Sequence, residues 1–188
     1  MPDLVLKPLT ALGHDAPVTE GLGPWTLTER ADVALASLAP RRGRAEDVAR
    51  VAAAAGITLP GPAQSAMGAV FGAFWMTPEM WMIEAPFASH ADIRAHLLGL
   101  FGDAASITEQ SDAWVRFDLS GENLPHLFEK LTNFDLATAS DGTATRSMIE
   151  HMGCYLVKRA ATLVTVYGGR SSAQSLHHAL KLAAQAQA

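Results

Sequence analysis

Apolar and polar residues alternate with two different periods along the chain, and these periods predict both strands and helices. Alternation at every second residue predicts a strand over 31–39, which Pro40 ends. Apolar residues at positions i, i+3 and i+7 predict a helix over 45–55, with Gly56 placed to terminate it. A short strand over 57–59 is expected to follow.

The next segment predicts a β-hairpin followed by a helix. Residues 69–76 and 81–85 are rich in aromatic and other β-favouring types, and the turn between them, 77–79, contains a proline that presets its backbone dihedral angle. Leucine and isoleucine at helical spacing predict a helix over 90–100, for which Ser89 is the expected N-terminal cap.

The remaining expected elements are a second strand pair at 106–109 and 113–119, a helix that begins at Gly121 or Asn123, strands at 148–158 and 163–167, and a closing helix at about 171–186. From residue 69 onward the order is therefore β-β-α-β-β-α-β-β-α. Strands that pair as hairpins between helices predict an α+β fold with mixed or antiparallel sheets and helices packed on one face.

The expected domain organisation is one domain preceded by an arm. Prolines and glycines interrupt residues 1–30 so often that an irregular N-terminal arm is expected there. Residues 31–188 are expected to form a single α+β domain of two similar lobes, since a chain of 188 residues suits one domain. No exact internal repeat is visible in the sequence.

Composition adds a hint of an interface and argues against nucleic acid. Charged residues make up only 18% of the chain, below the usual share of roughly a quarter, which favours a sizeable protein–protein contact. The formal net charge is −5. The one dense basic run, Arg41-Arg42-Gly43-Arg44, predicts a solvated turn or a charged loop facing a partner, and no nucleic-acid partner is expected.

The single cysteine, Cys154, rules out an internal disulfide framework and a cysteine-based zinc site. It lies in an apolar stretch, so a buried core thiol is expected. No signal peptide is visible, and no stretch approaches the roughly 18 unbroken apolar residues of a membrane span. A soluble, cytoplasmic protein without a membrane partner is therefore expected.

The candidate chemical groups do not assemble into a recognisable site. The histidines are scattered over different elements, and adjacent His177 and His178 diverge on a helix. The segment Gly168-Gly169-Arg170-Ser171-Ser172 runs from a strand into a helix, where backbone amides can bind an anion, but a turn with a capping serine is the simpler interpretation. Trp75 and Trp81 flank the hairpin turn and are expected to pack into the core or an interface.

Several carboxylates could pair in space, although their spacing cannot show it: Glu84, Glu109, Asp112, Asp118 and Asp135. From the residues alone, no catalytic residue, no cofactor-binding residue and no metal ligand is assigned.

Three stretches together resemble the gamma subunit of heterotetrameric sarcosine oxidase. The first is FWMTPEMWMI at 74–83, which is similar to a hairpin of the folate-binding superfamily that includes the glycine-cleavage T-protein. The second runs from ITEQSD at 107–112 through VRFDLSG to FDL at 134–136. The third is TR at 145–146 followed by GRSSAQSL at 169–176. The resemblance covers about 59–180.

This resemblance implies a T-protein-like folate-binding domain and a specific setting. The assembled enzyme of that family oxidatively demethylates sarcosine to glycine with oxygen and passes the one-carbon unit to tetrahydrofolate. FAD and FMN would lie on or next to the beta subunit, NAD and folate on the alpha subunit, and zinc on the delta subunit. The chain itself would bind no cofactor and would be a structural subunit whose partners are the alpha, beta and delta subunits.

Two alternatives remain open. The chain could be a folate-binding or aminomethyl-transfer module, in which Arg146, Arg170 or the glycine turn meets the anionic glutamate tail of folate. It could also be the equivalent subunit of a related N-methyl amino acid dehydrogenase, such as an N-methylglutamate dehydrogenase, because the substrate pocket would lie on another chain.

Overall fold

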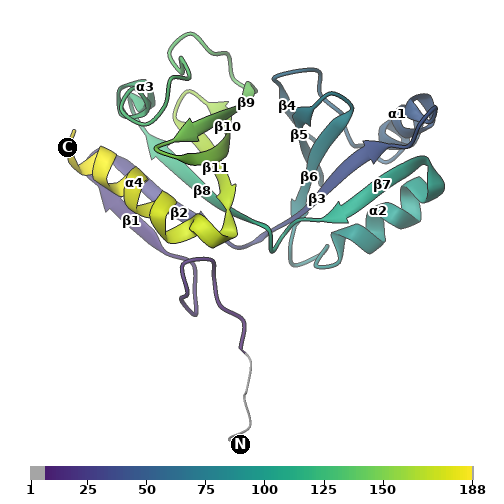
Figure 1. Cartoon of the computed structure of the whole chain (residues 1–188), viewed down its shortest axis with the longest axis horizontal. Helices are drawn as coiled ribbons and strands as arrows, with labels where there is room; N and C mark the ends of the chain where they lie inside the picture. Colours follow the sequence, from purple (N-terminus) through teal and green to yellow (C-terminus); the bar gives the residue numbers. More distant parts are fainter. Residues whose placement is uncertain (1–6, 188) are drawn as a thin grey trace, which may run out of the picture.

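The computed structural model describes residues 7–187, which fold into two antiparallel β-sheets (Figure 1). The six-stranded sheet has the order β1 (Thr19–Leu22), β2 (Trp25–Arg30), β8 (Trp114–Gly121), β11 (Leu163–Gly169), β10 (Met152–Ala160) and β9 (Ala144–Ile149). The five-stranded sheet has the order β4 (Ser65–Met67), β5 (Gly72–Thr77), β6 (Met80–Pro86), β3 (Val33–Pro40) and β7 (Ala105–Glu109). The α+β class predicted from the sequence is confirmed.

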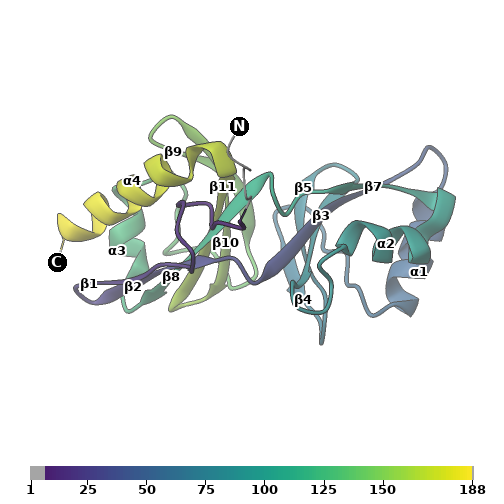
Figure 2. The same cartoon turned by 90° about the horizontal axis from the view of Figure 1, so that it is seen from below.

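Helices cover one face of each sheet. Four α-helices lie within the described residues, α1 (Ala45–Ala54), α2 (Ile93–Phe101), α3 (Leu124–Phe128) and α4 (Ala173–Gln185), with short 3-10 turns at Gly102–Ala104 and Arg170–Ser172. Helices α3 and α4 pack on the six-stranded sheet, and α1 and α2 on the five-stranded sheet. The other faces of the two sheets contribute to a shared apolar cluster, so the layers run helix, sheet, sheet, helix (Figures 1 and 2).

The described chain passes between the two sheets at two short connections, residues 31–32 and 110–113. Everything from β3 to β7 therefore belongs to the five-stranded lobe. Strands β1 and β2 join the later strands and helix α4 in the six-stranded lobe. The second connection lies against β3, close to the first, since the amide of Gln110 donates to the carbonyl of Leu35 (2.8 Å).

The prediction of an irregular arm over residues 1–30 is wrong for residues 19–30. Residues 1–6 lie outside the described residues, and 7–18 carry no helix or strand. Residues 19–30, however, form the hairpin of β1 and β2, in which Trp25, Leu27 and Glu29 are buried on alternate positions. The glycine and proline at 23–24 form the turn between two strands.

The strand predicted over 57–59 is also wrong, because this segment completes the end of α1. The amide of Gly56 donates to the carbonyl of Ala53 (3.2 Å), and the amide of Ile57 donates to that of Ala52 (2.8 Å). This is the hydrogen-bond pattern of a helix C-terminus that ends at a glycine. Ile57 is 2% exposed, and its β-branched side chain packs into the same apolar core as α1.

The central hairpin was predicted correctly, with β5 and β6 on either side of residues 78–79. The helix that follows it begins later than predicted. Helix α2 is capped by Asp92, whose carboxylate accepts from the amide of Ala95 (2.9 Å), whereas the hydroxyl of Ser89 contacts Pro86 and His90. Strand β4 was not predicted at all.

Residues 106–109 and 113–119 do not form the predicted strand pair. Strand β7 pairs with β3, and β8 pairs with β2 and β11 in the other sheet. The strand predicted over 148–158 is likewise two strands, β9 and β10, joined by a turn at residues 150–151. Glu150 adopts a left-handed conformation (φ 53°) that glutamate rarely adopts, so the sequence carries no turn signal there.

Gly121 at the end of β8 is expected to be irreplaceable. Its φ is 142°, and a Cβ there would collide with the carbonyl oxygen of Pro24 and approach the Cα of Trp25 at 3.1 Å. Gly121→Ala should lower the free energy of unfolding by about 2 kcal/mol or more, because only backbone movement relieves the contact. Urea denaturation measures the change.

Gly99→Ala is the matched control. Gly99 lies within α2, and nothing lies within 4 Å of a Cβ placed there. This variant should be stabilised by about 0.5–1 kcal/mol, since alanine favours the helix. Equal effects of the two variants would contradict the packing described at Gly121.

Candidate functional site

A buried ionic network joins the two sheets. Glu84 on β6 is 2% exposed and Asp118 on β8 is 6% exposed. The guanidinium of Arg116 lies between them. It donates from Nη1 to Glu84 Oε2 (3.2 Å) and from Nε and Nη2 to the two oxygens of Asp118 (3.0 Å each). Charge-assisted bonds of this forked geometry are among the stronger polar contacts in proteins.

The network continues on both sides of Arg116. The Arg159 Nη2 atom donates to Glu84 Oε1 (2.6 Å), and the hydroxyl of Tyr167 donates to Glu84 Oε2. At the other end, Arg30 donates to Asp118 (3.1 Å) and pairs with both oxygens of Asp32 (2.8 and 2.7 Å). Glu84 comes from the five-stranded sheet, whereas its three partners come from the six-stranded sheet.

The surroundings shift the pKa values of three members of the network, Arg116, Tyr167 and Asp32. Burial alone would lower the pKa of Arg116, but the surrounding anionic groups outweigh it and hold that pKa above its ordinary value. Burial, reinforced by Glu84, raises the pKa of Tyr167, which therefore stays a neutral donor. The hydrogen bond from Arg30 lowers the pKa of Asp32. None of these three shifts brings a group toward neutral pH, the range in which a general acid or base works.

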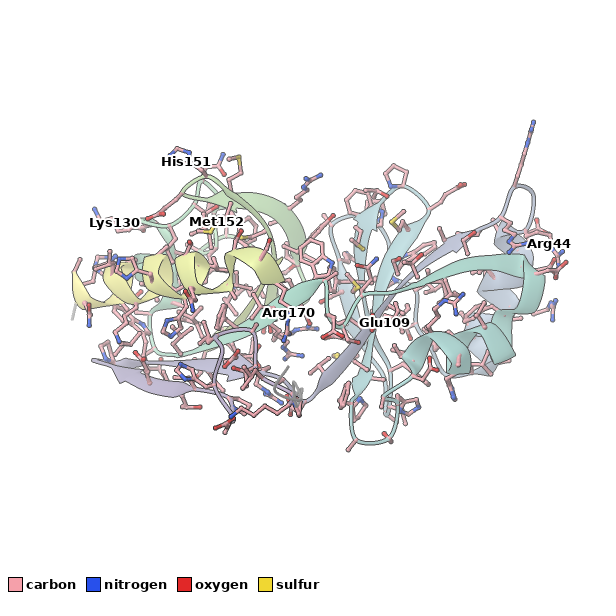
Figure 3. All side chains as sticks on the ribbon, turned by 60° about the horizontal axis from the view of Figure 1, so that its bottom comes forward. Arg44, Glu109, Lys130, His151, Met152 and Arg170 are labelled. Carbon is pink, nitrogen blue, oxygen red and sulfur yellow. The ribbon has the colours of Figure 1, made fainter. Side chains whose placement is uncertain are left out.

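A groove opens to solvent above this network, and we name it the junction groove. It consists of two neighbouring cavities of about 320 and 240 Å³ that share Arg30, Val33 and Arg116 as lining residues. The first cavity is bounded by the N-terminal segment and by the connection at 111–112, and the second by the loop at 67–70. Figure 3 places Arg170 and Glu109 near the middle of the molecule, whereas Arg44 lies at one end and Lys130 and His151 at the other.

Residues 7–18, which we call the N-terminal strap, form one wall of the groove. The buried carboxylate of Glu29 accepts from the amides of Leu12 (3.0 Å) and Val18 (3.2 Å). Arg170 donates to the carbonyl of Leu9 (2.9 Å). These contacts hold the strap against β2 and the start of α4, so the wall belongs to the folded structure.

The histidines are less scattered than the sequence indicated. The rings of His90 and His96 lie 4.8 Å apart, and both pack against Phe71. A separate depression is lined by three others, His14, His177 and His178. Within residues 7–187, however, no three metal-ligating side chains lie close enough together to hold a metal ion.

The thiol of Cys154 is a core group, as predicted. It is 1% exposed, and burial raises its pKa to about 11. Trp81 packs against the core of the five-stranded lobe and donates to the carbonyl of Pro60 (2.7 Å). Trp75 lies opposite Trp81 across the hairpin and is partly exposed.

The glycine turn before α4 does not have the predicted serine cap. Ser172 occupies the capping position, but its side chain makes no capping hydrogen bond. A Cβ on Gly168 would collide with the side chain of Leu176, so close packing of strand against helix explains this glycine. Arg146 and Arg170 line different cavities, so they do not form one anion site.

Of the five carboxylates considered from the sequence, two meet in the network and three do not. Glu109 accepts from the amide of Ser111 (2.7 Å), Asp135 stabilises the turn at 135–138, and the side chain of Asp112 is 92% exposed. The basic run at 41–44 is a loop in which Arg44 pairs with Asp47 (2.6 Å) and Asp103 (3.2 Å).

Sequence reasoning missed five members of the network, Arg30, Asp32, Arg116, Arg159 and Tyr167. The one available signal was the alternation in β8, which places Arg116 and Asp118 on the same face of the strand. That pattern predicts a polar face open to water, whereas the second sheet covers it.

Comparison with solved structures shows a shared fold. One chain of the heterotetrameric sarcosine oxidase from Corynebacterium sp. U-96 matches with a TM-score of 0.74 and 20% identity, covering 89% of this chain and 87% of that chain. The glycine cleavage system aminomethyltransferase T from Bartonella henselae matches with a TM-score of 0.63 and 11% identity, covering 85% of this chain. Only 48% of that transferase is covered, so this chain spans about half its length.

No family model matches the sequence, and a search of curated proteins also found no match. At 20% and 11% identity, the two structural matches establish the T-protein-like fold. No helix within residues 7–187 has the length and apolar character needed to cross a membrane.

Glu84 is expected to be the most sensitive polar position in the chain. Glu84→Gln should lower the free energy of unfolding by about 3–5 kcal/mol, because it leaves the buried charge of Arg159 without a carboxylate and Arg116 with Asp118 alone. Glu122→Gln is the matched control at an exposed position, with an expected change within about 0.5 kcal/mol. Similar denaturation midpoints for the two variants would contradict the role of the network.

Cys154 should react with a thiol reagent only when the protein unfolds. With its pKa raised to about 11, roughly one thiol in a thousand is ionised at pH 8, and the thiolate is the reactive form. Colour development with a disulfide reagent should therefore be slow in buffer and fast in guanidinium chloride. Rapid reaction of the folded protein would mean that the thiol is accessible and activated.

Proposed function

We propose that this chain is the gamma subunit of a heterotetrameric sarcosine oxidase, or its equivalent in a related N-methyl amino acid dehydrogenase. In this role it binds the alpha, beta and delta subunits and completes the assembly. The oxidative demethylation of sarcosine to glycine takes place on the partner flavin subunits. The FAD, FMN, NAD, tetrahydrofolate and zinc of the assembly are bound by those other chains.

One observation carries the proposal, namely the nearly end-to-end correspondence with a single chain of such a complex. The match covers 89% of this chain and 87% of the other, so the shared fold includes nearly all of both. The transferase match differs, because about half of that protein has no counterpart here. The first match therefore supports the subunit role more strongly than the second supports a transferase role.

The chemistry of the junction supports a structural role. The charged groups of the network are paired with one another. The pKa of Arg116 is held above its ordinary value, and Tyr167 stays a neutral donor. Such a network can hold two lobes in one geometry, and its side chains are already engaged by hydrogen bonds within the chain. The fold alone does not assign a function, so the proposal depends on the partners.

Co-expression with the alpha, beta and delta chains encoded in the same organism tests the proposal. We expect this chain to co-purify with them through several columns. Omitting it should reduce sarcosine-dependent peroxide production by about tenfold or more through loss of the assembled complex. Size-exclusion chromatography and a peroxide assay give the two readouts, and replacing sarcosine with N-methylglutamate separates the two enzyme types.

The opposite result favours the folate-binding alternative. If the other chains assemble and turn over normally without this one, the subunit proposal is wrong. Calorimetric titration of the isolated chain with tetrahydrofolate then distinguishes a binding module from an unrelated protein. Heat of binding that saturates at equal stoichiometry would support the transferase-like module suggested by the second structural match.

A further inference from the structure

We infer that the junction groove is the docking surface for a partner-protein segment that carries apolar side chains together with a lysine or an arginine. The inference rests on the proposed function, because it names the face and the chemistry through which the subunit would bind its partner. Four observations carry it: exposed apolar side chains, the shape of the groove, the distribution of its charges and the rigidity of its floor.

Exposed apolar side chains gather at this groove. Seven large apolar side chains are exposed within the described residues, and four of them line the groove: Leu9, Met67, Val70 and Phe87. Met67 is 65% exposed and the other three are 43–46% exposed. Single exposed apolar residues are ordinary, but a contiguous group marks an interaction site. Burial of such side chains by a partner is the main favourable term in association.

The groove has the form of a binding site for a chain segment. Its two cavities, of about 320 and 240 Å³, meet at Arg30, Val33 and Arg116. A ligand that filled both would extend from the N-terminal strap past the connection at 31–32 to the loop at 67–70. Small-molecule sites are concave and bury most of their ligand, whereas here four large apolar lining side chains remain 43–65% exposed, which favours a partner large enough to cover them.

The most exposed charged side chains that line the groove are acidic. Those of Asp15, Asp32 and Asp112 are 78%, 64% and 92% exposed, and Asp15 pairs with Lys7 (2.8 Å). The arginines of the groove are less exposed, at 37% for Arg30, 35% for Arg170 and 14% for Arg116, and each has a carboxylate of its own chain within 4 Å. Asp112 is 3.9 Å from Arg170, which is too long for a hydrogen bond. The net charge of the whole chain is −5. Electrostatic complementarity therefore favours a basic residue on the partner.

The floor of the groove is rigid before any partner arrives. Arg30 and Arg116 are each held by hydrogen bonds to two carboxylates. The strap is held by Glu29 and Arg170. A preformed surface loses little conformational entropy on binding, so most of the contact energy is retained as affinity.

The first test uses the isolated full chain and two matched series of short synthetic peptides. Both series have the same leucine and phenylalanine positions, and one carries lysine where the other carries glutamate. Fluorescence anisotropy should give dissociation constants at least about tenfold lower for the lysine series. Phe87→Asp should weaken this binding by about tenfold, and so should Asp112→Lys. Absence of binding, or equal binding of both series, would overturn the inference.

Met148→Asp is the control for these variants. Met148 is 56% exposed but lies on β9, away from the groove, so the new charge should leave peptide binding unchanged. Circular dichroism and thermal unfolding establish that each variant is folded. Should Phe87→Asp not fold, Val70→Asp tests the other cavity, since Val70 is 46% exposed in a loop.

The second test repeats these variants in the co-expressed assembly and separates the inference from the proposed function. If the wild-type chain co-purifies and the groove variants do so equally well, the docking inference is overturned while the subunit role stands. If the wild-type chain binds none of the oxidase subunits but still prefers lysine peptides, the subunit role fails and the groove remains a docking surface. A self-associating chain that Phe87→Asp makes monomeric would identify a second copy as the occupant and would also overturn the inference.

Discussion

The polar contact that holds the two sheets together depends on one carboxylate, that of Glu84. It is the member of the network that the five-stranded sheet supplies, and it accepts hydrogen bonds from Arg116, Arg159 and Tyr167 of the other sheet. Burying these charges costs several kcal/mol per ion in lost hydration. The attraction between the charges offsets that cost only when the geometry is good and every partner is present. Gly72, directly opposite on β5, leaves the space that the carboxylate fills, since a Cβ there would lie 2.8 Å from Glu84 Oε1. The strand pairing within one sheet thus positions the group that binds the other.

Apolar packing around the network makes this arrangement specific. Phe74 stacks on Tyr167 with ring centroids 5.0 Å apart, and Tyr155 contacts both Phe74 and Trp114. These rings exclude water from the ion pairs, which strengthens each correct contact and increases the cost of an unpaired charge. A lobe displaced by one strand position would separate Glu84 from Arg116 and Arg159 and leave Arg159 without a carboxylate. The floor of the junction groove is held in one arrangement for the same reason. Arg30 and Arg116 belong to the network and also line the groove.

Sequence reasoning succeeded for several local elements. It failed where distant segments meet and where a turn lacks the residues that usually mark one. The hairpin of β5 and β6 and the span of α4 follow from neighbouring residues, namely a turn proline and helical spacing of apolar residues. The network could not be found in this way, because Arg116 and Glu84 are 32 positions apart and lie in different sheets. Nothing in the spacing of β7 and β8 shows that the chain changes sheets between them. The turn at Glu150 lacks the usual glycine or asparagine, so β9 and β10 were merged into one strand.

The same physics supports the proposed role of this chain as a platform in an assembly. A catalytic site needs groups whose protonation can change or whose charges remain available to a substrate. At this junction the arginines are bound by the chain's own carboxylates, and the tyrosine hydroxyl is bound by Glu84. Those bonds leave fewer groups free to react, and they hold in place a surface lined by exposed apolar side chains and by carboxylates that face water. A stiff, amphipathic surface is suited to recognising another protein, because it can bury apolar area without first reorganising its own charges.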